Sequence, residues 1–234
     1  MKQYLPRRLC SLFLVAVSFF LAACDTQHPF LSDERVLLQA QTFLSECNLS
    51  ECDYRIVFHD GILRSTPHWR FAKLPQYPDG AIYASGGKTY FCEGASGVLE
   101  SNAAKGISLE SPYIHEVTDV SFAEYDAFAN ALLDVLKQGV HDTAICTVRY
   151  NREHITIGDY LYFDFTPAFL GSDAFVALTG ELYAGGFISF VYDDRSGDVT
   201  NCSVQLWVYD ETGQTQQITE HSFTSGAFAS KYMW

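Results

Sequence analysis

The chain has 234 residues, of which 48% are hydrophobic and 15% aromatic, and its formal net charge at pH 7 is −13. This aromatic-rich composition indicates a packed globular protein and excludes a disordered one. The acidic surplus repels phosphate groups, so nucleic acid is not an expected ligand. The charge either keeps the domain soluble beside an anionic bilayer, which is the preferred interpretation, or suits a cationic partner. The segment SGGKT (85–89) ends like a phosphate-binding loop but has Ile82 where that loop needs glycine, so nucleotide binding is not expected either.

The first element in the chain is an apolar segment behind a basic start. Lys2, Arg7 and Arg8 precede a run from Leu9 to Ala23, and small residues close that run. This layout predicts a secretory signal peptide over residues 1–23. A membrane-spanning helix is a poorer fit, because it needs about 20 consecutive apolar residues.

The end of this segment, Leu21-Ala22-Ala23-Cys24, resembles the lipobox of bacterial lipoproteins. The resemblance implies cleavage before Cys24 and attachment of two or three acyl chains there, which suffice for stable anchoring. It implies a lipid-anchored protein on the periplasmic face of a bacterial cell membrane. Asp25 resembles the residue that retains enterobacterial lipoproteins in the inner membrane, so the inner membrane is favoured and the outer membrane stays open. The alternatives are an ordinary cleaved signal peptide or an uncleaved anchor.

A lipidated tether (24–32) leads to the first folded part, which we predict as an α+β subdomain over 33–95. Ser32, Asp33 and Glu34 favour a helix start. Apolar residues then follow at helical spacing: Val36, Leu37, Ala40, Phe43 and Leu44. After this helix the pattern alternates, which predicts strands at 54–58, 69–74, 81–85 and 88–93. A loop rich in Gly, Ser and Ala follows at 96–112.

The second α+β domain is predicted over 113–234. Ser121 and Glu124 have the spacing of a helix capping box, and Gly139 marks the end of this helix. Its apolar stripe consists of Phe122, Tyr125, Phe128, Ala129, Leu132, Leu133 and Leu136. Strands are expected at 144–150, 160–166, 174–179, 182–193, 200–210 and 216–223, with a hairpin turn at 193–198.

These elements predict an α+β fold in which helices pack on antiparallel sheet. Two arrangements are compatible with the pattern. In one, the chain forms two units, each a helix followed by an antiparallel meander; in the other, it forms one two-layer α+β domain. The two halves share their pattern but little sequence identity, so both arrangements stay open.

Five cysteines remain after the signal peptide and the lipidated Cys24: Cys47, Cys52, Cys92, Cys146 and Cys202. An oxidising compartment favours disulfides, and five cysteines allow at most two. The pairs expected first are Cys47 or Cys52 with Cys92, and Cys146 with Cys202. The spacing does not match that of a zinc site, so neither a metal nor another cofactor is expected.

Three histidines stand next to carboxylates, in His59-Asp60, His115-Glu116 and His141-Asp142. Vicinal residues on a strand point to opposite faces, so none of these pairs makes a catalytic dyad by itself. The histidines could still meet in a folded cleft, which would indicate an anchored hydrolase. Surface positions are the preferred interpretation, and no residue is predicted to be catalytic.

Aromatic residues in the last strands suggest a binding surface instead. Alternation places Tyr192, Trp207 and Tyr209 on the sheet face away from the helix, where exposed aromatics suit a partner or a shallow ligand groove. The alternative, which is slightly favoured for this face, is a second packed layer formed by the first half of the chain. The preferred hypothesis is a membrane-anchored, non-enzymatic binding or envelope-assembly module. The alternatives are an inhibitor or immunity protein directed against a cationic enzyme, and the anchored hydrolase.

Overall fold

The computed structural model describes residues 32–57, 61–93, 114–151, 159–193, 198–210 and 212–225. The predicted signal peptide, Cys24, the tether up to residue 31, the loop at 96–112 and the pair His59-Asp60 lie outside these ranges. Within them, no helix is both long and apolar enough to cross a membrane.

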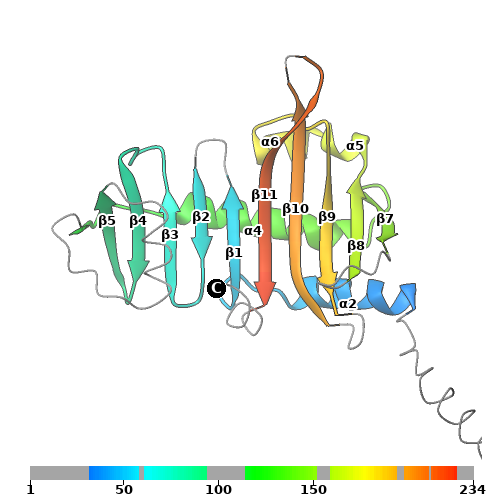
Figure 1. Ribbon diagram of the computed structural model, residues 1–234, viewed down its shortest axis with the longest axis horizontal. Coiled ribbons are helices and arrows are strands. Elements are labelled where there is room, and N and C mark those ends of the chain that lie inside the picture. The colour runs from blue at the N-terminus through cyan, green and yellow to red at the C-terminus, as the bar shows by residue number, and fades with distance from the viewer. Residues whose placement is uncertain are drawn as a thin grey trace, which may run out of the picture.

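The fold is α+β and is dominated by one antiparallel sheet (Figure 1). The described helices are α2 (Asp33–Glu46), α4 (Ala123–Gly139), α5 (Pro167–Leu170) and α6 (Asp173–Thr179). The first meander comprises β1 (Cys52–Val57), β2 (Ile62–Ser65), β3 (Trp69–Lys73), β4 (Gly80–Ser85), β5 (Lys88–Glu93) and β6 (Ile114–Glu116). The second comprises β7 (Cys146–Asn151), β8 (Asp159–Phe165), β9 (Gly185–Tyr192), β10 (Val199–Tyr209) and β11 (Thr215–Ser225).

The two meanders are fused into a single 11-stranded sheet with the order β6-β5-β4-β3-β2-β1-β11-β10-β9-β8-β7. The last strand makes the junction, since β11 pairs with β10 on one side and with β1 on the other. Without β11, the edge of β1 would expose a row of unpaired backbone groups, which folded proteins avoid. The arrangement as two separate helix-plus-meander units is therefore wrong.

Helix α2, from the first half of the chain, packs against elements of the second half. Helix α2 packs on the strands of the second meander: the ring centroids of Phe43 and Phe190 lie 6.4 Å apart in an edge-to-face contact. It also contacts α4, because the Gln41 side chain donates a hydrogen bond to the carbonyl of Val140 at 2.9 Å. The first helix is thus part of the core formed by the last strands, and the strands that follow it directly form the other end of the sheet.

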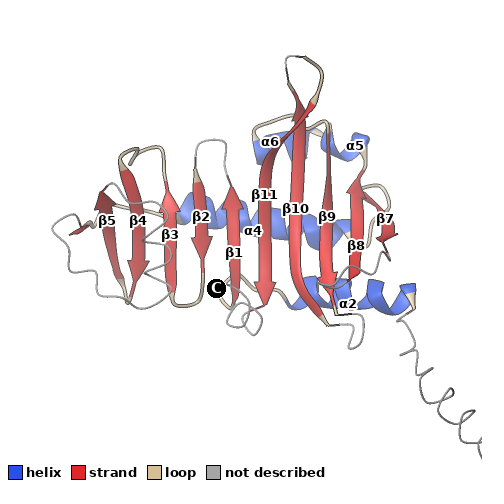
Figure 2. Cartoon of the chain, viewed as in Figure 1, coloured by secondary structure: helices blue, strands red, loops and turns tan. Residues whose placement is uncertain are grey.

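All four described helices lie behind the sheet in the view of Figure 2, and α4 crosses the strands almost at right angles. With 17 residues, α4 spans about 25 Å, and it carries the chain from the β6 edge toward the β7 edge. Throughout the following description, the sheet face that contacts these helices is the inner face, and the opposite one is the outer face.

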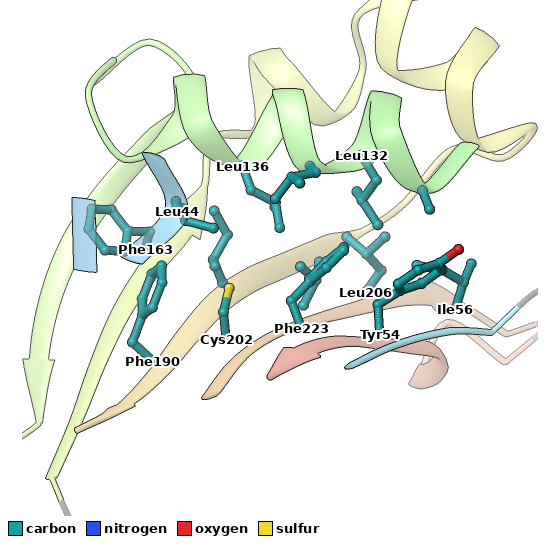
Figure 3. Packing of buried hydrophobic residues seen from close by; sticks show 14 of the residues in the cluster. Leu44, Tyr54, Ile56, Leu132, Leu136, Phe163, Phe190, Cys202, Leu206 and Phe223 are labelled. Atoms are coloured by element: carbon teal, nitrogen blue, oxygen red, sulfur yellow. The ribbon is translucent and has the colours of Figure 1, made fainter. Parts of the chain in front are cut away.

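The core lies between α4, α2 and the inner face, as Figure 3 shows. Leu132 and Leu136 of α4 point toward the strands and are completely buried. Their fully buried counterparts on the sheet and α2 are Leu44, Ile56, Phe190, Cys202, Leu206 and Phe223. The predicted apolar stripes of both long helices therefore face the sheet, as helical spacing requires.

Two local predictions are wrong. Residues 174–179, expected as a strand, belong to helix α6. The features that mark this segment as a helix are at its two ends: the Ser172 hydroxyl accepts a hydrogen bond from the Phe175 N–H at the start, and Gly180 ends the helix with φ 75°. The capping box of α4 is not formed either, because Ser121 Oγ accepts from the Ala123 N–H at 3.3 Å and the N-cap residue is Phe122.

Candidate binding surface

The outer face differs from the rest of the molecule in its charge. The chain carries a net charge of −13, but basic and acidic side chains are nearly balanced on the outer face. The basic ones are Arg55, Arg64, Lys73, Lys88 and Arg149, and the acidic ones are Asp53, Glu116, Asp164 and Glu220. The helical layer is acidic by contrast, with Asp33, Glu34, Glu46, Glu124 and Asp134 exposed on α2 and α4.

A row of aromatic side chains crosses the outer face over β8, β9 and β10, and we call Tyr160, Tyr162, Phe187 and Trp207 the aromatic row. Tyr160 and Tyr162 stack with their centroids 5.9 Å apart, and Phe187 meets Tyr162 edge-to-face at 5.2 Å. Trp207 continues the row against Phe187 at 5.8 Å. Every member is half-buried, so each ring is held by its neighbours while part of it remains open to solvent.

Gly185 explains how the Trp207 ring comes to rest on the sheet. The two residues are direct partners in the register of β9 and β10. A Cβ atom at Gly185 would lie 2.5 Å from the indole Nε1, so only glycine leaves room for the ring there. Its neighbour Gly186 faces inward, where a Cβ would lie 2.5 Å from the Leu206 side chain. The two adjacent glycines therefore serve opposite faces: Gly185 lies beneath the half-buried indole on the outer face, and Gly186 lies in the core.

Arg149 of β7 closes the row at the edge of the sheet. Its guanidinium lies 4.4 Å from the ring centroid of Tyr162, a cation–π contact. Nε and one terminal nitrogen donate to the two carboxylate oxygens of Asp164, each at 2.8 Å. This bidentate pair raises the pKa of Arg149 further and fixes the orientation of its guanidinium.

The outer face of the first meander differs because several apolar side chains at its centre are buried. Phe71 is 3% exposed, Tyr83 7% and Cys92 1%. Trp69 packs beside Tyr83 with the ring centroids 6.4 Å apart. Trp69 and Tyr90 are half-buried on this face, and the Arg64 guanidinium lies 5.2 Å from the Trp69 ring centroid. Accessible aromatic rings therefore occur on both meanders, but the second carries the longer row and the more exposed Tyr209.

The sequence placed the binding surface partly on the wrong side. Trp207 and Tyr209 lie on the outer face, and Tyr209 is 65% exposed. Tyr192 does not: it shares a face with Ile188 and Phe190, is 5% exposed and belongs to the core. Alternation within β9 separates its two faces but does not say which one meets the helices; the pairing of Ile188 with Val204 and of Phe190 with Cys202 places the Tyr192 side inward.

Three members of the aromatic row were missed: Tyr160, Tyr162 and Phe187. A signal was present, because Tyr160, Tyr162 and Asp164 alternate with Leu161, Phe163 and Phe165 in the segment YLYFDF. Their convergence with Trp207 depends on the order β8-β9-β10 and on its register. Alternation within one strand does not supply that order.

The predicted disulfide pairings are also wrong. Cys92 lies on the outer face of β5, whereas Cys52 lies on the inner face of β1, four strand positions away. Cys146 on β7 and Cys202 on β10 both face the core but are three strand positions apart, or about 14 Å. A disulfide requires Cα atoms within about 7 Å, so neither pairing can form in this fold.

The two described histidines with neighbouring carboxylates, His115 and His141, do not meet, and His59 lies outside the described residues. His115 lies on β6 at one edge of the sheet, and His141 follows α4, whose end leads into β7 at the other edge. Both are exposed. Within the described ranges no three His, Cys, Asp or Glu side chains are grouped so that they could hold a metal ion.

His221, which the sequence did not single out, is buried instead. It is 2% exposed, lies on the inner face of β11 and packs edge-to-face against Phe128 of α4 at 5.7 Å. Its Nδ1 accepts a hydrogen bond from the Val57 N–H at 3.1 Å, beyond the last backbone pair between β1 and β11, Arg55 with Ser222. Burial, assisted by the nearby Arg55, lowers its pKa to about 4.

Comparison of the chain with protein-family models, with curated proteins and with solved structures gives no match.

Proposed function

We propose that this chain is a lipid-anchored binding protein of the bacterial envelope, which docks a protein partner on the outer face of β8–β10 and does not catalyse a reaction. The observation that carries the proposal is the aromatic row with Arg149 at its end. Trp, Tyr and Arg are the residue types that dominate the binding energy of protein interfaces.

The geometry of the row supports this function in two ways. First, the rings are already ordered by contacts with one another and by the bidentate pair of Arg149 with Asp164, so docking would immobilise few free side chains. Second, the charges on the outer face are almost balanced. A partner that covers this face would leave little uncompensated charge buried, which is the main electrostatic cost of an interface.

The surface can be tested with a photo-crosslinking amino acid placed at its margin. We expect the full-length protein to form the same discrete adduct in cells from positions 160 and 209, because Tyr160 is at one end of the aromatic row and Tyr209 follows Trp207 at the other end, on the same outer face. Positions 38 and 182 are the matched controls: Leu38 is 60% and Leu182 65% exposed, and neither lies on the outer face, so no such adduct is expected there. In the probe at position 209, Trp207→Ala should weaken binding of the purified adduct partner at least about tenfold.

An adduct that forms equally from positions 38 and 182 would show that the outer face is not the docking surface. So would an unchanged affinity of the Trp207→Ala protein. Trp207 is only half-buried on the outer face, so the Trp207→Ala protein should still fold. A circular dichroism spectrum like that of the wild type would show that any loss of binding is not a loss of folding.

The lipid anchor is tested separately, by the mass and location of the protein. We expect the wild-type mature protein to begin at Cys24 and to carry two or three acyl chains, with the protein recovered in the membrane fraction. Cys24→Ser should remove the acyl chains and shift the protein to the soluble fraction. An unlipidated wild-type protein with Cys24 unmodified would overturn the anchor and leave the docking proposal standing.

The acidic helical layer supports a second candidate, an inhibitor of a cationic enzyme. Exposed carboxylates on α2 and α4 would meet such a partner by charge complementarity. In that case adducts would form from position 38 on α2, and binding would weaken steeply as salt is raised. Docking on the nearly balanced outer face predicts a weak salt dependence, so a salt titration distinguishes the two.

A further inference from the structure

We infer that Cys47 and Cys52 form a dithiol that closes to a disulfide, with Cys47 as the attacking sulfur. Their sulfur atoms lie 3.7 Å apart, in contact but not bonded. This inference concerns the turn between α2 and β1 and is independent of the outer-face proposal.

The local backbone brings the two cysteines together. Cys47 is the C-cap residue of α2, and Cys52 is the first residue of β1. Between them, Asn48 organises a tight turn: its carbonyl accepts from the N–H groups of Glu51 and Cys52 at 3.0 and 3.1 Å. Its side-chain oxygen also accepts from the Ser50 N–H at 3.1 Å. The thiols are thus placed side by side by a turn that is hydrogen-bonded on its own.

The two sulfurs are not equivalent. Cys52 is 5% exposed, whereas Cys47 is half-buried and accessible to a reactant. The Lys137 ammonium lies beside Cys47 and donates a hydrogen bond to its carbonyl at 3.2 Å. The contact between the two thiols favours a thiolate on one of them; the Lys137 ammonium favours it on Cys47, whereas burial raises the pKa of Cys52. Cys47 therefore supplies the thiolate, and Cys52 is the resolving thiol.

The reaction is a thiol–disulfide exchange with a disulfide-bearing oxidant, either a protein or a small molecule. The Cys47 thiolate attacks one sulfur of the oxidant, which breaks the oxidant's S–S bond and releases its first thiolate. Cys52 loses its proton to solvent and attacks the Cys47 sulfur in the resulting mixed disulfide, releasing the second thiolate. The two cysteines lose two electrons, and the oxidant is reduced to two thiols.

The other cysteines are poor competitors. Cys202 is completely buried, and burial, together with the nearby Cys47 sulfur, raises its pKa well above the usual value. Cys92 and Cys146 are 1% and 3% exposed, and burial raises the pKa of each thiol. Neither lies within reach of the Cys47–Cys52 pair, because of their places in the sheet.

The sequence offers a clean readout. Cleavage after Arg35 and Arg55 yields a tryptic peptide, 36–55, that contains Cys47, Cys52 and no other cysteine. After treatment of the folded, full-length protein with oxidised glutathione, and alkylation of the remaining thiols, we expect this peptide to have lost two hydrogens and to carry no alkyl group. Reduction followed by alkylation should then add two alkyl groups.

Two matched variants identify the attacking sulfur. Cys52→Ser should accumulate a mixed disulfide of Cys47 with glutathione, because no resolving thiol remains. Cys47→Ser should react with glutathione at least about tenfold more slowly, because Cys52 is buried and protonated. Equal rates in the two variants would overturn the role of Cys47. A wild-type peptide alkylated at both cysteines after oxidation, or Cys47 cross-linked to Cys202, would overturn the pair itself.

Discussion

Replacing Phe190 with alanine should lower the free energy of unfolding by about 3 to 5 kcal/mol, the usual cost of removing a buried aromatic ring. Phe190 is completely buried between the sheet and the helical layer. Its ring centroid lies 5.6 Å from that of Phe163 on β8 and 6.4 Å from that of Phe43 on α2. Neither layer can move into the space, because both are held by their own packing. Urea denaturation of the wild type and the variant measures this loss, provided that the two proteins show the same m-value.

Phe187 provides the matched control for this prediction. It lies on the same strand, three residues earlier, but on the outer face and only half-buried. Phe187→Ala should therefore cost about 1 kcal/mol. Equal losses from the two variants would contradict the assignment of the faces. If Phe190→Ala does not fold, Phe190→Leu still provides a measurable loss of about 1 kcal/mol.

Lowering the pH from about 6.5 to about 4 should destabilise the protein by about 3 kcal/mol through His221 alone. Its pKa is near 6.5 in the unfolded chain and about 4 in the native fold. Between these values the unfolded state binds a proton that the native state excludes. Stability is therefore complete above about pH 6.5, falls with pH through this window, and levels off below about pH 4.

The structural reason is specific to Nδ1. In the native fold this nitrogen accepts the hydrogen bond from the Val57 N–H, so the proton of the neutral ring is on Nε2. Protonating Nδ1 would remove the acceptor and place a charge against Phe128 and near Arg55. The native state therefore resists protonation both by burial and by hydrogen bonding.

His221→Gln isolates this contribution, because glutamine offers an acceptor oxygen to Val57 but does not titrate. We expect urea denaturation near pH 7 and near pH 4.5 to show a smaller pH dependence for this variant than for the wild type. Carboxylates titrate in both proteins, so the difference between their changes in unfolding free energy with pH is the contribution of His221. Identical slopes would contradict the native pKa of about 4.

Local chemistry explains which elements were predictable. Both long helices follow from apolar spacing, and α2 begins where Ser32 accepts a hydrogen bond from the Arg35 N–H. Helix α6 was missed because its apolar residues resemble a strand, while only Ser172 and Gly180 mark it as a helix. Its identity is decided by its place in the core, where Phe175 is 1% exposed and packs against Phe165.

The candidate surface shows the same division. Alternation within β10 was enough to place Trp207 opposite Leu206, because neighbouring residues of a strand face opposite sides. It could not bring Tyr162 and Phe187 to Trp207, because those contacts join three strands. The disulfide predictions failed for a related reason: Cys52 and Cys92 belong to the same meander but lie on opposite faces of strands four positions apart.

The class of fold, the two amphipathic helices, most of the strands and the inward side of β10 could be predicted from the sequence alone. These are set by periodicity and end signals within a few consecutive residues. Long-range packing, by contrast, was needed to show that β11 returns to β1 and fuses the meanders, that α2 packs on the distant β9, and that Tyr192 is buried while Tyr162 is half-buried. Those outcomes depend on strand order and register, which long-range pairing fixes when unpaired edges and apolar faces are buried together.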